Sequence, residues 1–201
     1  MNYKIKTNTE LTPSLAEAYI YRGIVLSEML KWEEAVQDLN KAIELDPLNE
    51  QAYLVRAEII DVIDDEAPLK DYNKCIEMNP NKVELYAARG LYFYTHNKDK
   101  EALKDFAKVL KMNPYDIDIL QCRGDYYSDE GMYPEAFLDY HKVLEIKPND
   151  ACAHRCIAEV LFHMGYYEAG MKSLKTAAKL NYRFEKELDD PCWKEMCGIK
   201  D

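Results

Sequence analysis

The sequence has no apolar run that approaches the roughly 20 residues needed to span a bilayer, so an integral membrane protein is not expected. Behind Lys4 and Lys6 there is no apolar stretch of the kind that forms a secretory signal. We therefore expect a cytoplasmic protein. In that compartment thiols stay reduced, and most of the cysteines should be small buried apolar residues. They are Cys75, Cys122, Cys152, Cys156, Cys192 and Cys197.

Basic residues are scarce: 26 Lys and Arg stand against 37 Asp and Glu, which gives a formal net charge of −11. A protein that binds a nucleic acid needs clustered Lys and Arg to displace counterions from the phosphates, and no such cluster occurs. A basic partner is more natural, because opposite charge accelerates the encounter of two proteins.

Recognisable catalytic motifs are also missing. There is no glycine-rich phosphate loop, no G-x-S-x-G elbow and no H-E-x-x-H pair. Carboxylates are frequent, but pairs of them on solvated helix faces do not indicate acid–base catalysis. We expect a protein that is not an enzyme and that needs no cofactor.

One group of potential metal ligands shares a stripe of a single predicted helix. It consists of Cys152, Cys156, Glu159 and His163. From first to last the stripe would extend about 16 Å, at about 1.5 Å per residue, which is too far for one ion. A subset could still form a site with Cys192 or Cys197. Helix packing explains the stripe more simply, so no metal site is predicted.

The sequence does contain an internal repeat. With 48% hydrophobic residues it can also form a sizeable core. Similar ten-residue segments end at Pro47, Pro80, Pro114 and Pro148, so the spacings are 33, 34 and 34 residues. A fifth copy ends at Tyr182 in place of proline. Counting back from these residues gives five predicted repeats, at 16–49, 50–82, 83–116, 117–150 and 151–184.

Each repeat shows the apolar periodicity of two amphipathic helices, close to 3.6 residues. Asn49, Asp116 and Asp150 each stand just before a first helix, where their side chains can cap free backbone N–H groups. The prolines should end the second helices, because proline disfavours the helical conformation in the residue before it.

The order of large and small residues resembles the tetratricopeptide repeat. The first repeat carries this pattern at Tyr19, Gly23, Leu26, Ala35, Leu39, Ala42 and Pro47. The third and fourth repeats carry it from Tyr86 and Leu120 onward, whereas Pro68 and Gly170 depart from it in the second and fifth. The resemblance implies an all-α, right-handed superhelix, or solenoid, of five helix-turn-helix repeats.

A solenoid leaves an apolar face open at each end and needs caps. We predict an N-terminal extension with the start of the first helix at 1–15. The C-terminal segment 185–201 is predicted to cap the last repeat as a further helix. The apolar residues expected to make this contact are Phe184, Leu188, Trp193 and Met196.

Four first helices carry Arg directly before the small residue, and four second helices carry Asp at one equivalent place. The pairs are Arg22 with Asp38, Arg56 with Asp71, Arg89 with Asp105 and Arg123 with Asp139. In the fifth repeat both are absent, and Ile157 and Ser173 take their places. This joint presence and joint loss predicts four Arg–Asp bridges, each within one repeat.

In proteins of this family the first helices line a concave groove, so the resemblance also implies a binding surface. The residues that we predict to bind a partner there are Glu17, Ile20, Ile24, Glu28, Leu54, Glu58, Asp61, Leu91, Tyr94, Asp118, Asp125 and Asp129. The apolar members form a track through the first three repeats, and the fourth repeat adds a mainly acidic wall. Such a groove suits a basic or amphipathic segment.

Some proteins of the family clamp the acidic C-terminus of heat-shock chaperones. Here Ile20 and Ile24 stand where that clamp needs Lys and Asn, and Glu84 where a later Lys is expected. The main functional prediction is therefore a scaffold or adaptor that binds a basic or amphipathic segment of another protein. Two alternatives stay open: a dedicated chaperone or neutralising, immunity-type partner of one secreted or toxic protein, and a structural homo-oligomer.

Overall fold

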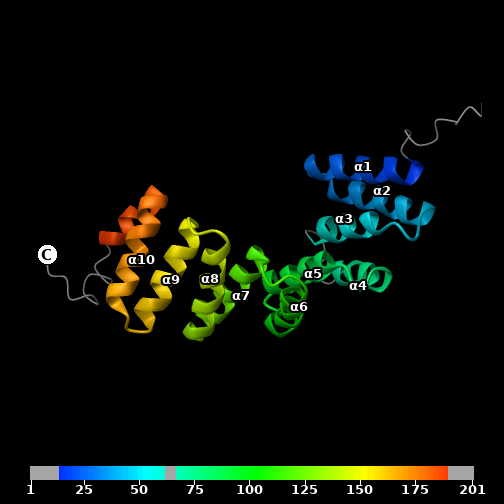
Figure 1. Cartoon of the computed structure of the whole chain (residues 1–201). Helices are drawn as coiled ribbons and strands as arrows, with labels where there is room; N and C mark the ends of the chain where they lie inside the picture. The colour runs from blue at the N-terminus through cyan, green and yellow to red at the C-terminus, as the bar shows by residue number, and fades with distance from the viewer. Residues whose placement is uncertain (1–13, 62–66, 190–201) are drawn as a thin grey trace, which may run out of the picture. The chain divides into compact units, whose positions relative to one another are not determined.

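The computed structural model describes residues 14–61 and 67–189, and every regular element in these two ranges is a helix (Figure 1). The elements are α1 (Leu15–Glu28), α2 (Trp32–Leu45), α3 (Glu50–Ile60), α4 (Pro68–Met78), α5 (Val83–Thr95), α6 (Asp99–Met112), α7 (Ile117–Asp129), α8 (Tyr133–Ile146), α9 (Ala151–His163), α10 (Tyr167–Leu180) and the 3₁₀ helix η1 (Tyr182–Asp189). The prediction of an all-α helical-repeat fold is confirmed.

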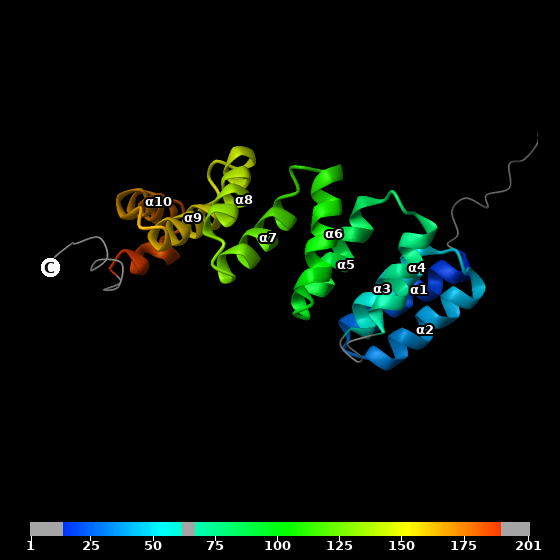
Figure 2. The ribbon, with the colours of Figure 1, turned by 90° about the horizontal axis from the view of Figure 1, so that it is seen from below.

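The chain divides into two compact units, residues 1–85 and 86–201, and the boundary falls within α5. Helices that follow each other in the first unit, such as α1 and α2, pack against one another. In the second unit α7 packs on α8 and α9 on α10, and Figures 1 and 2 show α9 and α10 side by side with η1 next to them.

The helices begin where side-chain oxygens cap them. Asn49, Asp116 and Asp150 each accept a hydrogen bond from the backbone N–H three residues later, at 3.2, 3.2 and 2.9 Å. Ser14 caps α1 in a reciprocal capping box with Glu17. The second helices α2, α4, α6 and α8 each end two residues before a proline, as predicted.

In the first unit the core lies between α1, α2 and α3. It contains Ile20, Leu39 and Ala42, with Ala52 and Ile59 from α3. Helices α1 and α2 approach closely at Gly23, where a Cβ would lie 3.1 Å from Cγ of Leu39. A second cluster joins Tyr53, Cys75 and Leu85.

In the second unit the core continues along the helix pairs. Leu120, Val143 and Ala153 form one cluster, and Tyr140 packs with Ile157 in the next. A Cβ at Gly124 would lie 2.7 Å from the Tyr140 ring, so this glycine is needed for the close contact of α7 and α8.

Leu188 of η1 packs against the cluster of Ala158, Phe162, Met171 and Leu174, so at least this residue of the predicted C-terminal cap contacts the last helix pair. Trp193 and Met196, and with them the rest of the predicted cap beyond residue 189, lie outside the described residues. The same holds for residues 1–13 of the N-terminal extension.

The four predicted Arg–Asp bridges are present, and each is bidentate. The guanidinium Nε and Nη2 of Arg22, Arg56, Arg89 and Arg123 donate to the two carboxylate oxygens of Asp38, Asp71, Asp105 and Asp139, over 2.5 to 2.9 Å. The four aspartates are 3 to 7% exposed. An aromatic ring of the same helix lies beside each guanidinium, for example Tyr53 with its centroid 5.6 Å from Cζ of Arg56.

We predict that Asp139→Ala lowers the free energy of unfolding by about 3 kcal/mol or more, because it leaves the guanidinium of Arg123 without its buried partner. The more accessible pair of Arg155 and Glu159, with side chains 36 and 39% exposed, is the matched control, and Glu159→Ala should change stability by less than about 1 kcal/mol. Urea unfolding followed by circular dichroism measures both. Equal effects of the two substitutions would contradict a structural role for the buried pair.

Candidate protein-binding surface

In the first unit the predicted groove residues lie on α1 and α3, but they are not equally accessible. Glu28 and Glu58 are exposed, whereas Ile24 and Leu54 are half-buried and pack on the two core clusters. The carboxylate of Glu17 accepts a hydrogen bond from the backbone N–H of Ser14, so it also stabilises the start of α1. Asp61, also half-buried, directly follows α3.

Ile20 is a correction to the predicted groove. It is 1% exposed and belongs to the core with Leu39 and Ala42. Because Ile20 and Gly23 are three residues apart, they lie on the same face of α1, and this face packs against α2. The apolar track through the first repeat therefore consists of Ile24 alone.

In the second unit the predicted residues of α7 are three acids, called the acidic cluster below, and Tyr94 of α5 lies near two of them, Asp125 and Asp129. Asp118 and Asp129 are exposed, and Asp125, Leu91 and Tyr94 are half-buried. Burial, together with the neighbouring carboxylates of Asp125 and Asp129, raises the pKa of the Tyr94 hydroxyl to about 12. The acidic wall and the aromatic end of the predicted track thus lie next to each other.

Asp125 is the central residue of this cluster. Its Oδ1 accepts a hydrogen bond of 2.7 Å from the hydroxyl of Tyr140 on α8. Burial raises the pKa of the Asp125 carboxyl, and the negative charges of Asp129 and Glu159 raise it as well. The hydrogen bond from Tyr140 and the positive charge of Arg155 lower it in part. A cation placed here would relieve the repulsion, so the cluster is suited to bind a Lys or Arg side chain.

Arg155 on α9 is the basic residue of this region, and its charge is already compensated. Its Nη1 lies 3.1 Å from Glu159 on the same helix and 3.9 Å from Glu187 on η1. Two carboxylates therefore face one guanidinium, and the surface stays acidic overall.

Sequence reasoning did not identify two of these residues as part of the site. In the repeat pattern, Tyr140 is the large residue of the second helix of the fourth repeat. Nothing in its spacing shows that its hydroxyl reaches Asp125. Glu187 follows the last repeat, where no periodicity applies. The excess of acids on the first helices was the one signal in the sequence that pointed to this region.

The potential metal ligands of α9 are not gathered into a site. Within residues 14–61 and 67–189 no three His, Cys, Asp or Glu side chains are placed to hold a metal ion. Burial raises the pKa of the Cys156 thiol to about 11, so this thiol is protonated at neutral pH. His163 stacks on the ring of Tyr133, with centroids 4.8 Å apart. Cys192 and Cys197 lie outside the described residues.

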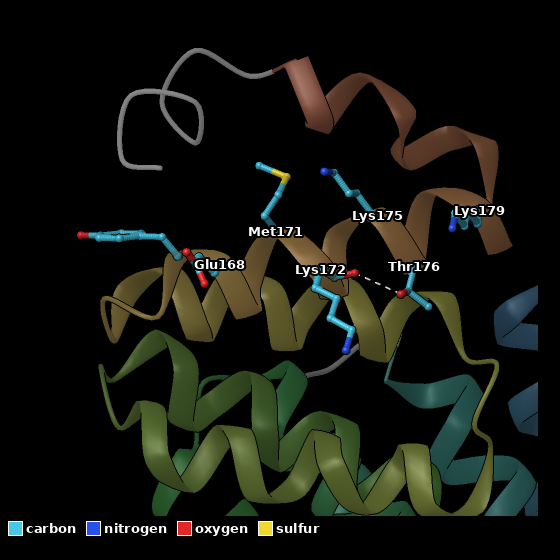
Figure 3. A pocket seen from close by; sticks show the side chains of 7 residues that line it. Glu168, Met171, Lys172, Lys175, Thr176 and Lys179 are labelled. Atoms are coloured by element: carbon cyan, nitrogen blue, oxygen red, sulfur yellow. Dashed lines mark hydrogen bonds between the residues drawn. The ribbon is translucent and has the colours of Figure 1, made fainter. Parts of the chain in front are cut away.

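A pocket of about 560 Å³ lies along α10, a feature that the sequence analysis did not predict (Figure 3). Its lining consists of Tyr167, Glu168, Met171, Lys172, Lys175, Thr176 and Lys179. Figure 3 shows Met171 and Lys175 on the side of α10 where η1 lies, and the hydroxyl of Thr176 bonded to the carbonyl of Lys172, at 3.0 Å. The three lysines make this the basic end of an acidic chain.

No helix in the part of the chain that the structure describes is long and apolar enough to cross a membrane.

Comparison with known proteins supports the fold and the repeat. The sequence model of the family described as "Tetratricopeptide repeat" matches residues 16–49. A search of curated protein sequences found no significant match. The likeness to solved structures under 25% identity concerns the fold, not the function.

Three solved structures illustrate this likeness. MamA is 18% identical, with a TM-score of 0.73 over 86% of this chain and 94% of its own. A tetratricopeptide repeat protein from Parabacteroides merdae is 19% identical, with a TM-score of 0.78 over 92% and 74%. YrrB, a TPR protein with an unusual peptide-binding site, is 20% identical, with a TM-score of 0.66 over 92% of both chains.

We predict that Asp125→Asn does not destabilise the protein at pH 7 and raises its urea midpoint. Asparagine keeps an acceptor for the Tyr140 hydroxyl and removes a half-buried charge. Because folding raises the pKa of Asp125, its contribution to wild-type stability is present at low pH and is lost as the pH rises through the folded pKa. The difference between variant and wild type should therefore vanish toward pH 3. Asp118→Asn, at an exposed site, is the control and should show no such trend.

Proposed function

Because the chain is a tetratricopeptide-repeat protein, we propose that it is a non-catalytic scaffold or adaptor that holds a basic segment of another protein. The segment binds at the acidic cluster of the second unit, which consists of Asp118, Asp125 and Asp129 with Tyr94 beside them. The observation that carries the proposal is the position of Asp125: its half-buried carboxylate is held by the hydroxyl of Tyr140 and lies near the charges of Asp129 and Glu159, which the cation of Arg155 offsets only in part.

The chemistry of the cluster defines the class of partner. A Lys or Arg at Asp125 would replace repulsion between carboxylates by attraction in a half-buried position, where charge interactions are stronger than in open solvent. Leu91 and Tyr94 are half-buried and can contact the apolar part of the same segment. An amphipathic helix or an extended segment with basic residues satisfies both requirements. The peptide-binding site of YrrB is in keeping with this use of the fold.

Other ligand classes fit the cluster less well. An acidic C-terminus would meet Asp118, Asp125 and Asp129 with the wrong sign of charge, and a nucleic acid would be repelled by the net charge of −11. The cytoplasmic location stays a prediction from the sequence.

The first experiment is quantitative capture of partners by the wild type and by Asp118→Lys/Asp129→Lys. Both aspartates are exposed, so the double variant should fold. The matched control is Glu101→Lys/Glu135→Lys, which makes the same change of charge at exposed positions of the second helices α6 and α8. We expect a partner that the wild type and the control retain and that the first variant loses.

The same partner should bind more weakly at about 300 mM than at about 50 mM salt, because the contact is charged and exposed at its rim. A partner list that is identical for all three proteins would rule out the acidic cluster as the binding site.

We further predict that the affinity for the captured basic segment falls as the pH is lowered from 7 toward 4. Binding of a cation favours the ionised form of Asp125, whose pKa in the free protein is raised, so complex formation releases a proton in this range. Calorimetry in two buffers of different ionisation enthalpy measures the release. Asp125→Asn should reduce it, and an unchanged release in this variant would assign the proton to another group.

A further inference from the structure

The outward face of α1 is a stripe of apolar side chains in contact with solvent. Leu15, Tyr21, Val25 and Met29 are 63, 56, 52 and 59% exposed, and Ala18 between them is exposed as well. Their spacing of three and four residues places them on one side of the helix. The opposite side, with Ile20 and Gly23, packs against α2.

The later first helices bury the positions equivalent to Ala18 and, with one half-buried exception, those equivalent to Val25. Those equivalent to Ala18 are Ala52, Leu85, Ile119 and Ala153, which are 0, 1, 1 and 1% exposed. Those equivalent to Val25 are Ile59, Tyr92 and Val160, at 5, 4 and 0%, and the half-buried Tyr126. The stripe on α1 is therefore a repeat-stacking face without a preceding repeat among the described residues.

The later repeats show what covers such a face. Val36 and Ile43 of α2 pack into the cluster that holds Ala52 and Ile59 of α3. Between them, Asn40 accepts a hydrogen bond of 2.6 Å from Nη1 of Arg56.

In the second unit, Phe137 and Leu144 of α8 cover α9 in the same manner, in the cluster of Ile157 and Val160. The residue between them is His141. The covering element is thus always a helix with apolar residues at i and i+7 and a polar or small residue at i+4.

Arg22 gives an independent sign that no helix among the described residues covers this face of α1. The side chain of Arg22 is 64% exposed, whereas those of Arg56, Arg89 and Arg123 are 21, 20 and 21% exposed. All four arginines bind their aspartates in the same bidentate manner. The difference in their exposure therefore comes from the residues that cover the guanidinium from the preceding repeat. At Arg56, part of this cover is Asn40.

A second copy of the chain does not offer a suitable helix through its last repeat. In α10 the positions equivalent to Val36, Asn40 and Ile43 are Met171, Lys175 and Ala178. Lys175 would place its cation against Arg22, and Leu188 of η1 already packs on the cluster that contains Met171. The charge of Lys175 and the packing of η1 on α10 therefore both disfavour the binding of α1 from a second copy at this end, and with it head-to-tail assembly.

We propose that the outward face of α1 binds an amphipathic helix of a partner protein, which lies on it as the second helix of a preceding repeat would. The partner helix presents an aliphatic residue at i and i+7, against Ala18 and Val25. It presents an asparagine at i+4, whose amide oxygen accepts from Arg22. This surface belongs to the first unit and is separate from the acidic cluster of the second.

The test uses a fluorescent peptide with the sequence of residues 32–45, which contains Val36, Asn40 and Ile43 in the required spacing. A side-chain cross-link between positions 33 and 37 holds it helical, and both positions are exposed in α2. Anisotropy with the full chain should show saturable binding. Val25→Glu in the chain, or Asn40→Lys in the peptide, should weaken it by about tenfold or more, since each sets a charge in an apolar or cationic contact.

Leu138→Glu is the matched control, because Leu138 is an exposed apolar residue of α8, 62% accessible, outside the proposed surface. This variant should bind the peptide as the wild type does. Circular dichroism should confirm that both glutamate variants are folded, which is expected because both positions are exposed.

Any of four outcomes would overturn the proposal. The peptide fails to bind, or Val25→Glu and Leu138→Glu bind it equally. Sedimentation shows a dimer of the wild type that Val25→Glu dissociates, in which case a second copy occupies the face. The peptide binds only after residues 1–13 are removed, in which case the chain covers α1 with its own N-terminal segment.

Discussion

The bidentate contact between an arginine of the first helix and an aspartate of the second fixes the geometry of the first four helix pairs. A guanidinium that binds both oxygens of a carboxylate tolerates little rotation of either helix about its axis. In the first, third and fourth pairs the two residues are 16 apart, and in the second they are 15 apart, yet the contacts are the same. The second repeat is one residue shorter than the others, yet its arginine and aspartate make the same contact. The ion pair therefore sets the register of the two helices.

The fifth helix pair shows how the same packing is reached without the ion pair. Ile157 takes the place of the arginine, is 4% exposed and packs with Tyr140 and Val160. At Gly170 a Cβ would lie 2.7 Å from the Phe162 ring, so α9 and α10 approach more closely there than an alanine allows without a shift. Replacing a buried ion pair by apolar contact is often neutral or stabilising, because neither charge has to be desolvated. Close apolar packing therefore substitutes for the salt bridge in the last repeat.

Those parts of the fold that depend on contacts within one repeat could be predicted from the sequence. The prolines, the caps at Asn49, Asp116 and Asp150, and the Arg–Asp pairs are such local features. The accessibility of the binding surface was less predictable, because it depends on how each helix is rotated against its neighbour. Ile20 has the spacing of a groove residue but faces α2.

Two further contacts carry no periodic signal, one within the fourth repeat and one with a segment beyond the last repeat. The bond from Tyr140 to Asp125 depends on the length of one side chain, and the approach of Glu187 to Arg155 depends on a segment that follows the last repeat. Family resemblance placed the acidic residues on the first helices. Only the coordinates show which of them share an environment.

The position of each acid within the repeat determines whether it is available to a partner. The four aspartates of the second helices are buried and saturated by guanidinium groups, so they contribute to the structure and hardly to the surface potential. The acids of α7 lie on a first helix and take no part in the four Arg–Asp bridges. Their charge therefore contributes to the electrostatic potential at the surface. Asp125 combines both situations: Tyr140 of the second helix holds its carboxylate in place, and no cation close by balances it fully. In the proposed function, a fixed, half-buried and incompletely compensated carboxylate would offer a positive side chain both a defined position and a gain in electrostatic energy, and the acidic cluster would thereby distinguish one basic segment from another.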